Sequence, residues 1–128
     1  MTHLQQLFLM TGAFFGFLGI AAGAFGAHLL KSKISNESFD VFEVAVRYQM
    51  YHALALIGLV AILGLLPSTW LAIAGWMFII GVFIFSGSLY ALVFSGIRLW
   101  GAVTPLGGLL LLLGWLSLLL GGLLNRAS

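Results

Sequence analysis

The polar side chains best placed to do chemistry lie in one stretch, Arg47-Tyr48-Gln49-Met50-Tyr51-His52. On a helix, at about 100° per residue, Arg47 and Tyr51 share one face. Tyr48 and His52 share a second face, and Gln49 lies on a third. Because unpaired polar groups are costly in hydrocarbon, a membrane helix that is polar nearly all round should be surrounded by protein. We therefore predict that this stretch forms the polar centre of a helical bundle, where Arg47 meets an anionic group or a small polar solute.

Other apolar segments carry polar side chains that are predicted to reach the same end of the bundle. His28 closes the first segment, Tyr90 lies late in the third, and Thr104 lies early in the fourth. Glu43 precedes Arg47 by one helical turn, the spacing and order that favour an ion pair. The predicted network contains His28, Glu43, Arg47, Tyr48, Gln49, Tyr51, His52, Ser86, Ser88, Tyr90 and Thr104.

A simpler interpretation treats these residues as separate interfacial anchors. Arg47 could snorkel to lipid headgroups, and the tyrosines could belong to an aromatic belt. Independent anchors would occur at both ends of the bundle, whereas these side chains gather at one end. We therefore favour a connected network.

Three more specific functions, namely haem binding, metal binding and catalysis by a serine nucleophile, are less well supported. His28 and His52 could be axial haem ligands, but the ordinary roles of histidine need no cofactor. A metal site would need a third ligand from the acidic residues 37–43, whose spacing matches no recognised motif. Ser86-Gly87-Ser88 lacks the residues that flank a nucleophile elbow. The sequence therefore predicts no cofactor and no metal, and it leaves an enzymatic activity unsupported.

The composition is that of a membrane protein. The chain has 128 residues, of which 62% are hydrophobic and only 6% charged, and its mean hydropathy is +1.20. A soluble domain needs a far larger charged surface. The absence of cysteine rules out disulfides and Cys-ligated metals. The five Lys and Arg residues are scattered, so we expect the lipid bilayer, and not nucleic acid, as the partner.

Four apolar segments are long enough to cross ~30 Å of hydrocarbon as helices. They cover residues 7–28, 47–66, 70–94 and 102–124, and Pro67 ends the second. The first lacks the basic start of a signal peptide, so we expect a mature helix. Residues 36–46 are predicted to form a short amphipathic helix at the interface, capped by Ser35 or Asn36. The predicted fold is one all-α domain, residues 1–128, built as a four-transmembrane-helix bundle.

Two stripes of glycine predict close packing between helices. Gly12, Gly16, Gly19, Gly23 and Gly26 recur at steps of four or three residues, and Gly107, Gly114 and Gly121 recur every seven. One stripe could serve internal packing and the other self-association, which makes a homo-oligomer an expectation. A structural protein that docks another membrane protein through these stripes is the alternative to a binding function.

The basic residues predict the orientation of the bundle. Lys31, Lys33, Arg47 and Arg98 lie at the polar end, against Arg126 alone at the other. Because cytoplasmic loops carry an excess of Lys and Arg, the polar end is predicted to be cytoplasmic and both termini outside.

Four motifs resemble those of a known family of small membrane proteins. They are Gly23-Ala24-Phe25-Gly26-Ala27-His28, the segment 45–54 around Arg47-Tyr48-Gln49, Phe85-Ser86-Gly87-Ser88-Leu89-Tyr90, and Thr104-Pro105-Leu106-Gly107-Gly108. Their order along the chain is similar to that of the domain of unknown function 423 family, also called uncharacterised protein family 0382. The resemblance implies a multi-pass protein of the bacterial inner membrane with about four helices. It implies no particular activity, and it makes the motif residues candidates for an unassigned polar site.

Overall fold

The computed structural model describes residues 1–125 and shows an all-α membrane protein. The helices are α1 (His3–Ile20), the π-helix η1 (Ala21–Gly26), α2 (Ala27–Leu30), α3 (Asn36–Leu65), α4 (Thr69–Ser95) and α5 (Leu99–Leu124). The first three join without a break into one rod of 28 residues. Within these residues, four rods are therefore long and apolar enough to cross a membrane.

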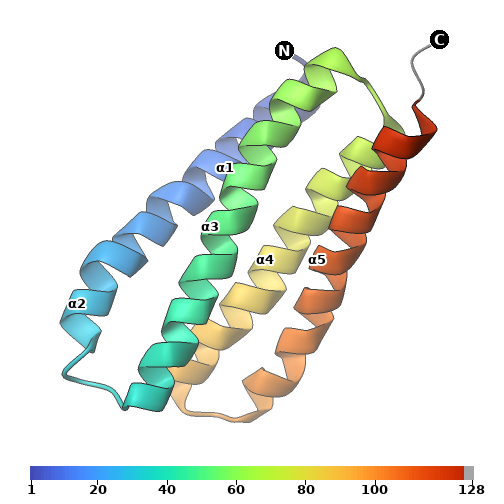
Figure 1. The fold of residues 1–128 in the computed structure, drawn as a ribbon. Helices are drawn as coiled ribbons and strands as arrows, with labels where there is room; N and C mark the ends of the chain where they lie inside the picture. The colour runs from blue at the N-terminus through green and yellow to red at the C-terminus, as the bar shows by residue number, and fades with distance from the viewer. Residues whose placement is uncertain (126–128) are drawn as a thin grey trace.

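The ends of the chain lie together at one end of the bundle. Figure 1 shows both termini beside the α3–α4 connection, and the α2–α3 and α4–α5 connections at the opposite end. This topology agrees with the one predicted from four spans. It places the segments that carry the predicted network at the same end. Arg126, which the orientation argument counts at the other end, lies outside the described residues.

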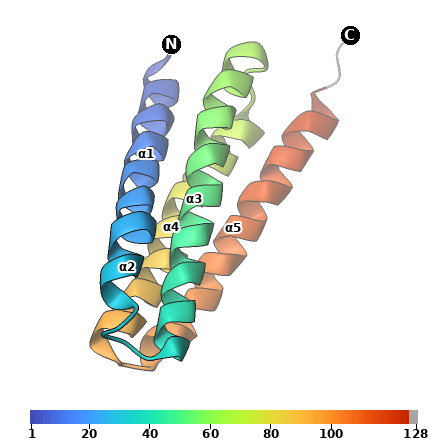
Figure 2. The same ribbon diagram turned by 60° about the vertical axis from the view of Figure 1, so that its left-hand side comes forward.

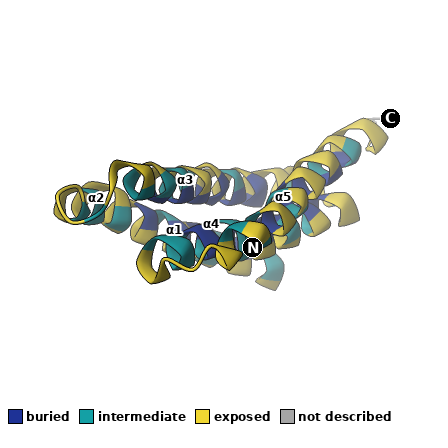
Figure 3. Cartoon of the chain, turned by 90° about the horizontal axis from the view of Figure 1, so that it is seen from below, coloured by how far each residue is buried: buried dark blue, intermediate teal, exposed yellow. Residues whose placement is uncertain are grey.

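The helices pack mainly on their neighbours in the sequence. α1 lies against α3, α3 against α4, and α4 against α5, whereas α1 and α4 meet mainly through side chains such as Phe15 and Phe83. In the described part of the chain, α5 makes no close backbone contact with α1 or α3. Figure 2 shows α5 diverging from α3 toward the end that carries the termini. The core, buried on the inner faces in Figure 3, is built from side chains of all four rods, including Phe8, Leu56, Phe78 and Leu111.

Both glycine stripes lie inside the bundle. A Cβ on Gly12 would lie 3.1 Å from the Ala53 carbonyl oxygen, and one on Gly23 would lie 3.1 Å from Val46, so the first stripe faces α3. A Cβ on Gly114 would lie 2.7 Å from the Phe78 ring, and one on Gly107 would overlap the Phe85 backbone, so the second stripe faces α4. The prediction of close packing is confirmed. Since both stripes are occupied within the chain, self-association or docking of another protein would have to use a different surface.

The segment 36–46 is helical, but it is not a separate interfacial helix. Ser35 caps it by accepting a hydrogen bond from the Ser38 backbone nitrogen at 3.1 Å, as one of the two predicted caps. From there α3 continues for 30 residues to Leu65, just before Pro67. No glycine or proline interrupts residues 36–57, so nothing in the backbone breaks the helix at Arg47.

The first and last rods also begin earlier than predicted. Thr2 and Gln5 form a reciprocal capping box that starts α1 at His3. α5 starts at Leu99, directly after the left-handed turn at Gly96, where φ is 71°. The sequence did not predict the π-helix η1, in which Gly23 and Gly26 lie beside α3.

Candidate functional site

Gln49 is the centre of the polar contacts between helices. Its side chain is only 5% exposed and points from α3 into the bundle. The amide nitrogen Nε2 donates to the Phe15 carbonyl oxygen of α1 at 2.9 Å. The amide oxygen Oε1 accepts a hydrogen bond from the Tyr90 hydroxyl of α4 at 2.7 Å. One side chain therefore links three helices, as the predicted network required, but it is Gln49 and not Arg47 that does so.

Two serines of α4 extend these contacts. Ser86 is buried and its hydroxyl donates to the Ala45 carbonyl oxygen of α3 at 2.7 Å. Ser88 faces the other way and lies 2.6 Å from the Thr104 hydroxyl of α5. Both serines are thus engaged in helix contacts. Within residues 1–125, no hydrogen bond joins either serine to a histidine.

His52 has both ring nitrogens engaged. Nδ1 lies 2.7 Å from the Tyr48 carbonyl oxygen, which can only accept, so Nδ1 carries the proton. Nε2 accepts a hydrogen bond from the Trp115 indole nitrogen at 3.0 Å. In this state the imidazole is neutral and has no free lone pair for a metal. The haem pair considered from the sequence is not formed, because His28 lies exposed on α2 while His52 is fully used.

Arg47 and Tyr51 lie on the outer face of α3, which corrects the prediction that the whole stretch is enclosed. Arg47 is exposed and Tyr51 is 53% exposed. Gln49 and His52 face inward, and residues two positions away point roughly to the opposite side of the helix. An exposed arginine at the end of a membrane bundle can be solvated by headgroups and water, so Arg47 needs no protein shell.

The outer face of α3 is part of a groove beside η1. Its volume is about 320 Å³, and Glu43, Arg47 and Tyr51 share it with Gly23 and Ala27. The remaining lining residues are apolar: Phe42, Val46 and Met50. Tyr48 lies to one side, where it stacks on Phe85 with ring centroids 4.6 Å apart. The groove therefore offers a guanidinium, a phenol and a carboxylate above an apolar floor.

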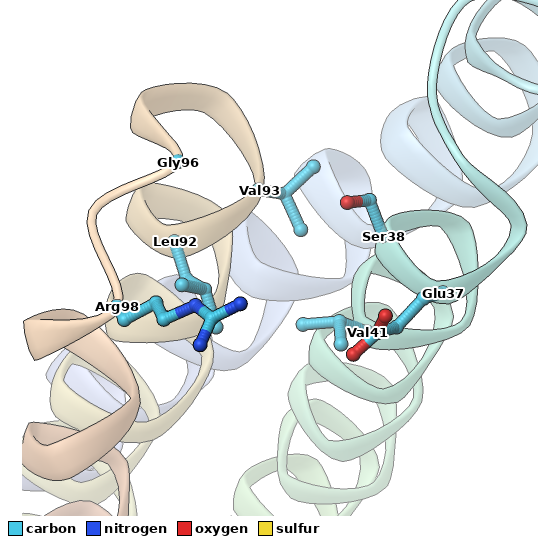
Figure 4. Close-up of a pocket in the computed structure, with 7 residues that line it drawn as sticks. All are labelled: Glu37, Ser38, Val41, Leu92, Val93, Gly96 and Arg98. Atoms are coloured by element: carbon cyan, nitrogen blue, oxygen red, sulfur yellow. The ribbon is translucent and has the colours of Figure 1, made fainter.

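A second polar hollow lies at the same end of the bundle. It measures about 470 Å³ and is bounded by the start of α3 and the α4–α5 connection. Figure 4 shows the Glu37 and Arg98 side chains directed into it from opposite walls. The predicted network included neither residue, although the sequence analysis considered Glu37 as a metal ligand and counted Arg98 in the orientation of the bundle. Like the groove at Arg47, this hollow therefore combines one carboxylate and one guanidinium.

Comparison with known proteins assigns the family. A family model described as protein of unknown function (DUF423) matches residues 22–108. The chain belongs to this family. The DUF423 match runs from η1 into α5, so it includes Gln49, Ser86, Tyr90 and Thr104 but not Trp115.

Several curated relatives of this DUF423 protein are named UPF0382 membrane proteins. One from Staphylococcus haemolyticus is 45% identical over 122 residues, covering 91% of this chain and 94% of the relative. One from Staphylococcus aureus is 42% identical and covers 91% of this chain and 94% of the relative. One from Staphylococcus epidermidis is 41% identical and covers 93% of this chain and 97% of the relative. No solved structure matches the chain. The resemblance found in the sequence is confirmed.

The DUF423 structure also contains polar contacts that the sequence analysis missed. Trp115 was not considered, although a tryptophan in the middle of a span, away from the interface, was a usable signal. At the end opposite the predicted network, the Gln5 amide donates to the Val60 carbonyl oxygen at 3.0 Å, and Ser117 donates to the Trp70 carbonyl oxygen at 2.6 Å. These contacts fix helix positions at the end opposite the groove.

Proposed function

We propose that this DUF423 protein binds an anionic lipid headgroup at Arg47, at the cytoplasmic end of a bundle in the bacterial inner membrane. One observation carries the proposal: Arg47 and Tyr51 are exposed one helical turn apart, above an apolar groove. A guanidinium can form two parallel hydrogen bonds with a phosphate, and the apolar floor can accept an acyl chain.

Glu43 and the small residues of η1 support this function. Glu43 shares the groove and precedes Arg47 by one turn, but the ion pair expected from this spacing is not formed within the described residues, so the guanidinium is available to an anion. Gly23, which lies opposite Val46, and Ala27 leave this wall of the groove free of large side chains. The groove therefore has room for the glycerol region of a lipid between the charged group and the hydrocarbon.

The charge distribution supports a cytoplasmic position for this end. Lys31, Lys33, Arg47 and Arg98 all lie there. The cytoplasmic leaflet carries anionic lipids, which attract such residues by about 1 kcal/mol each. Because the chain has no cysteine, single cysteines can test the orientation. We expect Thr69→Cys in intact cells to react with a membrane-impermeant maleimide, and Ser32→Cys to react only after the cells are opened. The reverse pattern would contradict the orientation.

The binding proposal is tested by lipid retention. We expect the purified protein to retain phosphatidylglycerol in preference to phosphatidylcholine in native mass spectrometry. Arg47→Ala should reduce that retention about fivefold, the effect of losing roughly 1 kcal/mol. Arg98→Ala is the matched control, an exposed arginine at the same end outside the groove, and it should retain phosphatidylglycerol. Equal retention by wild type and Arg47→Ala would overturn the proposal.

A free anion is the other source of the same chemistry. Adding inorganic phosphate to the retention assay separates the two sources. If the headgroup belongs to a lipid, millimolar phosphate should leave phosphatidylglycerol bound, because the acyl chains also contact the groove. Displacement by phosphate would instead indicate a site for a small anionic solute.

A further inference from the structure

Two cavities on the other side of η1 meet at one pair of polar residues. One, of about 320 Å³, lies toward the α2–α3 connection and is lined by apolar residues such as Leu30, Phe42 and Phe94. The second, of about 180 Å³, lies deeper along α1 and α4 and includes Phe83 and Gly87. Both cavities contain Leu18, Gln49 and Tyr90. We call the two together the α1–α4 groove. It lies between α1 and α4, whose backbones come close to each other at few points.

The polar pair in this groove has unused hydrogen-bonding capacity. The Gln49 amide nitrogen carries two hydrogens, and within residues 1–125 it donates only to the Phe15 carbonyl oxygen. The Tyr90 hydroxyl gives its hydrogen to Gln49, which leaves its oxygen free to accept. An amide hydrogen left unpaired in apolar surroundings costs about 1–3 kcal/mol. The groove therefore offers a donor to any ligand that brings an acceptor such as a carbonyl.

The depth of this donor matches that of lipid ester groups. α4 has 27 residues, which span about 40 Å at ~1.5 Å per residue. A hydrocarbon core of ~30 Å leaves about 5 Å of α4 outside at each end. Tyr90 lies less than two turns before the end of α4 at Ser95, so its backbone is about 2–3 Å inside the edge of the hydrocarbon. Ester carbonyls, which join the headgroup to the acyl chains, lie at this boundary.

We propose that the α1–α4 groove holds one acyl chain of a membrane phospholipid, with the ester carbonyl accepting the free Gln49 amide hydrogen. The chain would run past Leu18 toward Phe83 in the deeper cavity. The headgroup would lie beyond Leu30, where the exposed Lys31 and Lys33 offer positive charge to its phosphate. This site lies on the opposite side of η1 from Arg47 and does not depend on the function proposed there.

Gly87 allows a test that leaves the fold intact. A Cβ at this position would meet no atom within 4 Å, so Gly87→Leu places its side chain in the deeper cavity from an unobstructed start. Gly58→Leu is the matched control, since Gly58 on α3 is equally unobstructed and lines neither cavity. The probe is a phosphatidylcholine with a photoreactive acyl chain, added to purified protein in nanodiscs. We expect the label on peptides containing Phe14 or Phe83 to fall at least fivefold in Gly87→Leu and to persist in Gly58→Leu. Equal labelling of all three proteins would overturn the proposal.

Two further arms of this experiment test the chemistry. An ester-linked competitor should reduce the labelling at lower concentration than its ether-linked analogue, which has no carbonyl; equal competition would refute the role of Gln49. Organic extraction of the purified protein should release phospholipid, and a stoichiometric isoprenoid quinone in its place would overturn the assignment of the ligand. Arg47→Ala should leave this labelling unchanged, so failure at one site can be distinguished from failure at the other.

Discussion

At the residue scale, Gln49 does what a charged side chain could not do at the same place. An amide both donates and accepts, so one group satisfies a carbonyl of α1 and a hydroxyl of α4. A guanidinium has no acceptor and would need a counter-charge if it were buried. This difference explains why the neutral residue faces inward and Arg47 faces outward.

We expect Gln49→Leu to destabilise the protein by about 1 kcal/mol. Hydrogen bonds between membrane helices average about 0.6 kcal/mol each, and this change removes two. Gln6→Leu is the control, because Gln6 is exposed on α1 and should change stability little. The free energy of unfolding in mixed micelles measures both effects. Equal stability of the two variants would show that the Gln49 contacts do not hold the helices together.

The sequence predicted most of the residues that meet but not which one lies at the centre. Hydrophobic periodicity normally identifies the inner face of a helix. At residues 47–52 nearly every direction is polar, so the rotation of α3 could not be read there. The inward direction follows instead from Ala45, Gln49 and His52, which are buried at steps of four and three.

At the element scale, the α4–α5 contact depends on the absence of side chains. Gly107 abuts the Phe85 backbone, and backbone cannot move aside as a side chain can. The regular glycine spacing predicted this contact because each stripe occupies one helix face. The spacing could not identify the helix that packs against each stripe. That partner is decided by how the four rods tilt against one another, which the spacing within one helix does not reveal.

We expect Gly107→Ala to be strongly destabilising, by about 2 kcal/mol or more, because overpacking of a tight core typically costs ~1–3 kcal/mol. Gly58→Ala should leave stability unchanged or raise it slightly, since its added methyl meets nothing and alanine favours helix. Thermal unfolding of both variants in detergent gives the comparison. A tolerant Gly107→Ala would mean that α5 can shift away from α4 at little cost.

The continuous α3 illustrates a second limit of sequence reasoning. Polarity at residues 36–46 predicts an interfacial position, but polarity does not end a helix. Only a backbone signal does so, and the first strong one is Pro67. The turn η1 had no such signal, because glycine and alanine are compatible with both helix types.

At the scale of the whole molecule, the strongest packing joins α1 to α3 and α4 to α5. The connection between these two pairs is short and carries no charge, with Pro67 at its centre. We expect residues 1–67 and 68–128, expressed as separate chains in one cell, to reassociate in the membrane. Co-purification of one fragment with a tag on the other measures this. As a control, division inside α4 after Gly81 should prevent recovery; recovery from both divisions would show that the pairs are not the units of packing.

The pairing of neighbouring spans also bears on how the protein is made. The two helices of a pair can pack together as soon as the second helix has left the ribosome, before more distant segments are synthesised. The N-terminal half can therefore be in place while α5 is still being synthesised, and Gln49 already sits beside Phe15 before Tyr90 arrives. α1, one wall of the α1–α4 groove, would then be in the membrane before α4, the other wall. The acyl chain proposed for this groove could therefore bind while the protein is still being synthesised.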